Sequence, residues 1–110
     1  MEFEQYYVVI LKKGPNWTGE ATPELQSLQE RHLAHLGALF EQGVNLISGP
    51  IEDHAESGRR GISIYRYDAY DSIEALKADV EADPMFEIGH LAADYMTWHV
   101  PKGSSLANRE

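Results

Sequence analysis

Residues 22–50, TPELQSLQERHLAHLGALFEQGVNLISGP, decide the fold of this chain. The stretch reads as one long amphipathic helix, a turn and a strand. Four residues with the three-to-four-residue spacing of a single helix face are Leu25, Leu28, Leu36 and Leu39. The same spacing places His32 between them, so we expect a titratable imidazole on the buried stripe of this helix.

The two ends of this helix carry recognisable signals. Thr22 is a good N-cap, and Pro23 suits the first helical position. Gly43 predicts the end of the helix, and a strand over 44–48 follows, closed by a Gly-Pro pair. Gly37 in mid-helix costs about 1 kcal/mol relative to alanine, so we expect close packing on that side.

The rest of the chain supplies the remaining elements of one domain. We expect residues 1–100 to form a single domain and residues 101–110 a polar tail. Apolar or amphipathic runs between turn signals predict strands in 3–13, 61–67 and 92–100. The polar stretch 52–60 predicts a loop. Residues 71–74 open a second helix, and residues 84–91 form a short helical turn or loop. Trp17 lies in the loop after the first strand, where it either covers the core or lines a pocket or interface.

The resulting order, β-α-β-β-α-β, predicts an α+β, ferredoxin-like fold: a four-stranded antiparallel sheet with two helices on one face. The strands are apolar or aromatic on both faces, whereas a sheet with one face in water should alternate apolar and polar residues. In the first strand, for example, Tyr6 and Val8 alternate with Tyr7 and Val9. We therefore expect a homodimer that buries the helix-free face of the sheet.

Composition excludes several classes of function. The formal net charge of −9 argues against binding nucleic acid or an anionic membrane surface. The chain has no cysteine, so disulfides, thiolate nucleophiles and cysteine-ligated metals are excluded. Because no signal peptide or membrane-spanning run is evident, we expect a cytoplasmic protein.

Two residues are candidates for catalysis, and each has a structural alternative. His32 is either an inert helix histidine at the edge of the core or a general acid or base near neutral pH. Asp83 is either the N-cap of a short helix that starts at Pro84 or the partner that orients the imidazole. The fold would have to bring the two together, because 51 residues separate them.

Other polar residues carry weaker signals. Ser48, Gly49 and Pro50 form either a plain turn or a set of hydrogen-bond donors for a substrate oxygen. His32 and His35 are spaced for a shared metal, but no local carboxylate completes a motif, so we expect neither a metal nor a cofactor. The remaining histidines read as two loop residues and one residue at the dimer interface: His54, His90 and His99.

Taken in order, four motifs resemble those of the YciI-like (YCII-related domain) family. They are HLAHL at 32–36, EQG at 41–43, SGP at 48–50 and ADPMFEIG at 82–89. The resemblance implies a dimeric α+β barrel of ferredoxin-like subunits and an active site centred on a histidine and an aspartate. These fall on His32 and Asp83, and Phe86 joins residues 48–50 as a candidate substrate contact.

The resemblance also bears on activity. At least one relative is implicated in degrading chlorinated aromatics, by dehalogenation or hydrolysis of a ring product. This chain differs from the pattern in the longer loop 12–21, in Met85 where an aromatic residue commonly follows the proline, and in the polar tail.

Three hypotheses of function follow. The first is a small cofactor-free enzyme that performs elimination or hydrolysis on a small, aromatic or polar substrate through a His32/Asp83 dyad. The second is a non-catalytic dimer that binds a small molecule or a protein and uses the same pair as a structural hydrogen bond. The third, by analogy of fold alone, is a monooxygenase-like barrel.

Overall fold

The computed structural model describes residues 1–103 and confirms the predicted order of elements. The strands are β1 (Phe3–Lys13), β2 (Asn45–Pro50), β3 (Arg59–Arg66) and β4 (Leu91–Pro101), and the helices are α1 (Pro23–Glu41), α2 (Ile73–Glu81) and the short α3 (Pro84–Glu87). A single 3-10 turn, Tyr67–Ala69, lies between β3 and α2.

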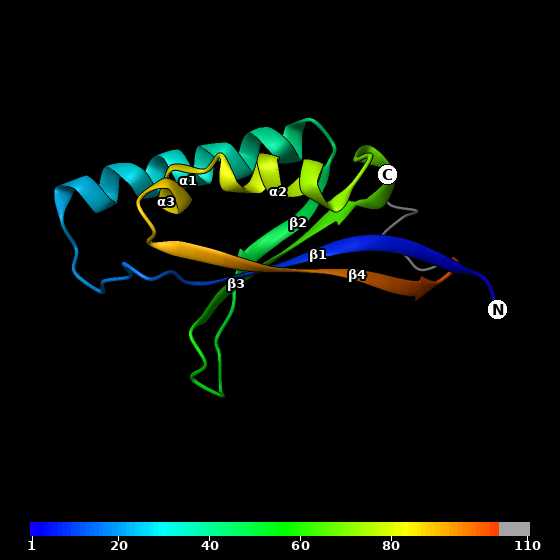
Figure 1. Cartoon of the computed structure of the whole chain (residues 1–110), viewed down its shortest axis with the longest axis horizontal. Coiled ribbons are helices and arrows are strands. Elements are labelled where there is room, and N and C mark those ends of the chain that lie inside the picture. The colour runs from blue at the N-terminus through cyan, green and yellow to red at the C-terminus, as the bar shows by residue number, and fades with distance from the viewer. Residues whose placement is uncertain (104–110) are drawn as a thin grey trace.

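The four strands form one antiparallel sheet in the order β2-β3-β1-β4. The three helices cover one face of this sheet and leave the other face bare (Figure 1). The first and last strands in the sequence pair along their whole length, from Phe3 opposite Pro101 to Lys13 opposite Leu91. This is the ferredoxin-like α+β fold that the sequence predicts.

Helix α1 begins and ends as predicted. The Thr22 hydroxyl accepts a hydrogen bond from the Leu25 amide at 3.1 Å. Gly43 follows the helix with φ +80°, a conformation that favours glycine. The prediction of close packing at Gly37 is wrong, because a Cβ placed there would meet nothing within 4 Å. Gly37 lies beside a pocket instead.

The β2–β3 hairpin differs slightly from the prediction. The predicted strands 44–48 and 61–67 are observed at 45–50 and 59–66, and Tyr67 lies in the 3-10 turn. The Asp53 carboxylate in the hairpin loop accepts hydrogen bonds from the Ala55 and Ser57 amides and pairs with the Arg59 guanidinium at 2.8 Å. β3 begins earlier than its apolar pattern indicates, because Arg59 pairs with Lys12 of β1.

The core lies between the helices and the inner face of the sheet. Its buried members come from β1, β3, α1 and α2: Tyr7, Val9, Leu11, Leu39, Tyr65, Leu76 and Val80. On α1 only His32 and Leu39 are fully buried, and the other leucines of the stripe are half-buried. The middle of α1 therefore does not seal against the sheet.

The helix-free face of the sheet is apolar across three strands. Tyr6 lies opposite Trp98, and Val8 lies between Ile64 and Met96. Met96 is 44% exposed and Trp98 48% exposed in the single chain. The homodimer expected from this face stays a prediction.

The C-terminal end of the domain is anchored on the first strand. Pro101 ends β4, and the Lys102 amide donates a hydrogen bond to the Glu2 carbonyl at 2.9 Å. The rest of the predicted polar tail, residues 104–110, lies outside the described residues. Within residues 1–103, no helix has the length and apolarity to cross a membrane.

Candidate functional site

The fold brings His32 and Asp83 into direct contact. His32 lies in the middle of α1, and Asp83 is the residue before α3. The His32 Nδ1 atom is hydrogen-bonded to Asp83 Oδ2, and the two residues are 7% and 2% exposed. The two candidates, 51 residues apart in the sequence, thus form one buried pair.

Asp83 combines its two predicted roles, because each carboxylate oxygen has a different partner. The Oδ1 atom accepts a hydrogen bond from the Met85 amide at 2.9 Å and caps α3. The Oδ2 atom is left for the imidazole. The cap holds the carboxylate in a fixed orientation, so the imidazole ring meets a pre-positioned acceptor.

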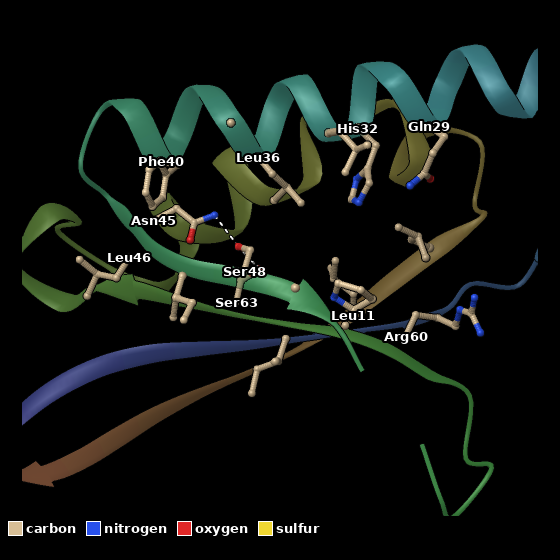
Figure 2. Close-up of a pocket in the computed structure, with 18 of the residues that line it drawn as sticks. Leu11, Gln29, His32, Leu36, Phe40, Asn45, Leu46, Ser48, Arg60 and Ser63 are labelled. Carbon is tan, nitrogen blue, oxygen red and sulfur yellow. Dashed lines mark hydrogen bonds between the residues drawn. The ribbon is translucent and has the colours of Figure 1, made fainter. Parts of the chain in front are cut away.

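This contact sets the hydrogen-bonding state of the imidazole. A carboxylate only accepts hydrogen bonds, so Nδ1 carries the proton that His32 donates to Asp83. The lone pair of neutral His32 then resides on Nε2, for which no hydrogen-bond partner occurs within the described part of the chain. The imidazole projects from α1 into a pocket (Figure 2).

The pocket lies between α1 and the β2–β3 end of the sheet. Its volume is about 650 Å³, within the range of about 300 to 1,000 Å³ that is typical of small-molecule sites. The walls are largely apolar, with contributions from Leu11, Leu33, Leu36, Phe40, Ile47 and Leu91. A small molecule with an apolar body therefore has space beside His32 Nε2.

Ser48, Gly49 and Pro50, the candidate substrate contacts, lie at the end of β2 and line this pocket. The Ser48 hydroxyl is already engaged: it accepts a hydrogen bond from Asn45 Nδ2 and shares one with the Ser63 hydroxyl, each at 2.7 Å (Figure 2). Asn45 is 2% exposed, and its Oδ1 atom is buried without a partner in the described chain. This polar group lacks the hydrogen bond that buried oxygens normally make.

Sequence reasoning missed Asn45 and Ser63 as pocket residues. A single asparagine within the apolar run VNLI was the available signal. Ser63 alternates with isoleucines on β3, so its inward direction depends on the register with β1, where it lies opposite Val9.

His90, read from the sequence as a loop residue, is a buried pocket residue. It is 8% exposed, and its ring stacks on Trp17 with the centroids 4.3 Å apart. The Nδ1 atom is buried without a partner among the described residues. Burial lowers the pKa of His90, and the nearby Arg60 charge lowers it further, so His90 is neutral near neutral pH.

Two backbone segments hold His90 in place. The Gly14 amide donates to the His90 carbonyl at 2.9 Å, and the Asn16 amide donates to the Gly89 carbonyl at 2.8 Å. The loop after β1 is thereby fixed to the segment before β4. Trp17 reaches the pocket because of this attachment.

Two predicted or possible site residues point elsewhere. Phe86, a candidate substrate contact, packs partly buried against the core and is not among the residues that line the pocket. His35 uses Nε2 to donate a hydrogen bond to the Asp79 carbonyl at 2.7 Å. It joins α1 to α2 and does not share the environment of His32.

Comparisons with known proteins support the fold. No family model matches the chain, and no curated protein matches it. A solved structure of 5-chloro-2-hydroxyhydroquinone dehydrochlorinase from Burkholderia phenoliruptrix AC1100, in complex with 2,5-dihydroxybenzoquinone, is similar at a TM-score of 0.52. The two chains are 19% identical, and the match covers 84% of this chain and 92% of the other. At this identity the likeness shows a shared fold.

Proposed function

We propose that this protein is a small, cofactor-free enzyme that performs acid–base chemistry on a small ring-containing substrate. The observation that carries the proposal is the buried His32–Asp83 pair, whose free Nε2 atom faces a pocket of about 650 Å³. In this proposal His32 is the catalytic base or acid, and Asp83 is a positioning residue. Residues 48–50, which form the end of β2 and not a turn, are substrate contacts.

Elimination fits the pair better than chemistry that needs a covalent nucleophile. Neutral His32 accepts a proton from the substrate at Nε2, the electron pair forms a new double bond, and a leaving group such as chloride departs with its electrons. The Asp83 carboxylate stabilises the imidazolium that results. No electron is gained or lost, so the step requires no oxidant or reductant.

The structural neighbour supports this choice of reaction class. Its name describes removal of hydrogen chloride from a chlorinated hydroxyhydroquinone, and it was solved with a dihydroxybenzoquinone. Hydroxylated chloroaromatic compounds are therefore the first substrates to test on this chain. Hydrolysis, with His32 activating a water molecule, is the second reaction to test.

The experiment measures chloride release and ring absorbance for a panel of chlorinated and hydroxylated ring compounds. For any substrate found, we expect His32→Gln to lower kcat by about 10²- to 10⁴-fold, the usual contribution of a general base. Asp83→Asn should lower kcat as well. His54→Gln is the matched control, because His54 is an exposed residue of the hairpin loop outside the pocket. Full turnover by His32→Gln would exclude the mechanism.

A non-catalytic binding module is the second candidate, because Asp83 also has a structural role as the cap of α3. If the pair is only structural, replacing His32 should cost a few kcal/mol of unfolding free energy by leaving a buried carboxylate oxygen unpaired. A catalytic pair is expected to behave differently, with His32→Gln near neutral for stability. Urea unfolding of the variant separates the two candidates even without a substrate.

We also propose that the protein acts as a homodimer through the helix-free face of the sheet. The exposed apolar area on β3 and β4 of this face is costly in water, and a second copy offers a face of the same shape.

A further inference from the structure

We infer that the pocket selects a small organic anion, whose negative group binds Arg60 at the end of the pocket that Arg60 forms with Trp17 and His90. This inference rests on the proposed function, because it names the class of substrate that reaches His32. The three residues are called the cationic end below. All three line the pocket.

No residue that the structure describes neutralises the charge of Arg60. Its neighbour Arg59 is paired with the Asp53 carboxylate at 2.8 Å, whereas no carboxylate within residues 1–103 forms an ion pair with Arg60. In a protein of net charge −9, an arginine left without an acidic partner beside a pocket is available for an anionic ligand.

Trp17 holds the Arg60 side chain in position. The guanidinium carbon lies 4.7 Å from the centre of the Trp17 ring, a cation–π distance. Lys13 Nζ lies 5.5 Å from the same ring and adds a second positive charge. The Trp17 ring also stacks on the imidazole of His90. Trp17 therefore contacts both other residues of the cationic end and joins the three side chains into one group.

His90 supplies an unpaired polar atom at this end of the pocket. Its Nδ1 is buried and has no hydrogen-bond partner in the described chain. A buried polar atom in this condition costs free energy that a ligand oxygen or hydroxyl can recover. The cationic end therefore offers a hydrogen-bonding group as well as charge.

The opposite end of the pocket disfavours an anion. Arg60 precedes Tyr65 by five positions on β3, and Tyr65 pairs with Asn45, so the two ends are about 16 Å apart along the strand. Figure 2 shows Arg60 and Asn45 at opposite ends of the pocket. The Asn45 end is next to the C-terminus of α1, where the helix dipole is negative, and it includes Glu41. The field along the pocket thus directs a negative group toward Arg60.

The test uses two probes of the same shape and different charge, 4-hydroxybenzoate and neutral 4-hydroxybenzamide. Isothermal titration at low salt near neutral pH should give a Kd for the anion about two- to fivefold below that for the amide, the gain expected from a partly exposed ion pair. Arg60→Gln should remove this preference, and Arg60→Lys should retain part of it. Arg31→Gln should leave it unchanged, because Arg31 is exposed on α1 and outside the pocket.

Three results would overturn the inference: equal affinity for the two probes, no binding of either probe at millimolar concentration, or equal weakening of both probes by Arg60→Gln. His32→Gln separates this inference from the proposed function. It should lower kcat by about 10²- to 10⁴-fold and leave the anion preference intact, since His32 lies outside the cationic end. A preference for the anion without any turnover would support the inference and count against the enzyme.

Discussion

At the scale of single residues, the site depends on which hydrogen bonds are completed and which are left open. His32 Nδ1 is hydrogen-bonded to one carboxylate oxygen of Asp83, and the other oxygen caps α3. Among the polar groups along the pocket, His32 Nε2, His90 Nδ1 and Asn45 Oδ1 have no hydrogen-bond partner within residues 1–103. An interior that leaves such groups unpaired is suited to a ligand that pairs them.

His90 should make the stability of the protein depend on pH. Its pKa is lowered in the folded chain from the ordinary value of about 6.5. At a pH between the lowered pKa of the folded chain and the ordinary pKa of the unfolded chain, the unfolded chain binds more protons than the folded chain. The free energy of unfolding therefore rises with pH across this window. The contribution of His90 is therefore complete above about pH 6.5 and is lost as the pH falls below that value.

Urea unfolding of the wild type and of His90→Gln between pH 5 and pH 8 measures this effect. We expect the wild type to lose more stability than the variant as the pH falls through the window. Parallel curves for the two proteins would show that His90 titrates alike in the folded and unfolded chains.

At the scale of elements, the loop after β1 and the segment before β4 behave as one unit. Gly14 lies so close to this segment that a Cβ at position 14 would be 2.3 Å from the Gly89 carbonyl oxygen. The contact is between backbones, so neither side can yield by turning a side chain. Trp17 and His90, two of the three residues of the cationic end, are positioned by it.

Gly14→Ala should therefore destabilise the protein by about 1 to 3 kcal/mol, as overpacking of a fixed backbone contact does. Thermal unfolding measures the loss, and Trp17 fluorescence should report a displaced loop. Gly19→Ala is the control, because a Cβ at position 19 meets nothing within 4 Å. Equal stability of the two variants would contradict the role assigned to this contact.

At the scale of the whole molecule, the sheet presents two apolar faces but the helices cover only one (Figure 1). Val8 and Tyr6 are buried by their neighbours, while Met96 and Trp98 on the edge strand β4 remain nearly half exposed. A second copy packed on this face would remove their surface from water.

We expect wild-type protein to sediment as a dimer at micromolar concentration and Met96→Asp to sediment as a monomer, because a charge would have to be buried in the interface. Ile88→Asp is the control, since Ile88 is exposed at the end of α3 and off this sheet face. A wild type that is strictly monomeric at this concentration would exclude the dimer.

The sequence by itself determined the order of elements and the positions of most of their ends. These are local properties: Thr22 caps α1, Ser72 caps α2 and Asp83 caps α3, each through a backbone amide two or three residues away. The period of the apolar residues then determined which helix face is buried, and with it the inward position of His32. The start of β3 was missed because the polar residue Arg59 joins the strand by pairing with Lys12 of β1, which the apolar pattern does not indicate.

Only the tertiary structure decided what surrounds His32. The pocket exists because part of α1 is not packed against the sheet. The spacing of apolar residues along α1 predicts contact over the whole helix, so it does not reveal the pocket. Asn45 and Arg60 come from the two strands of one hairpin and His90 from the distant segment before β4, and strand register and backbone contacts bring all three to the walls of one cavity. The chemistry of each side chain follows from its residue type, but the cavity that the three side chains share is produced by long-range contacts in the folded chain.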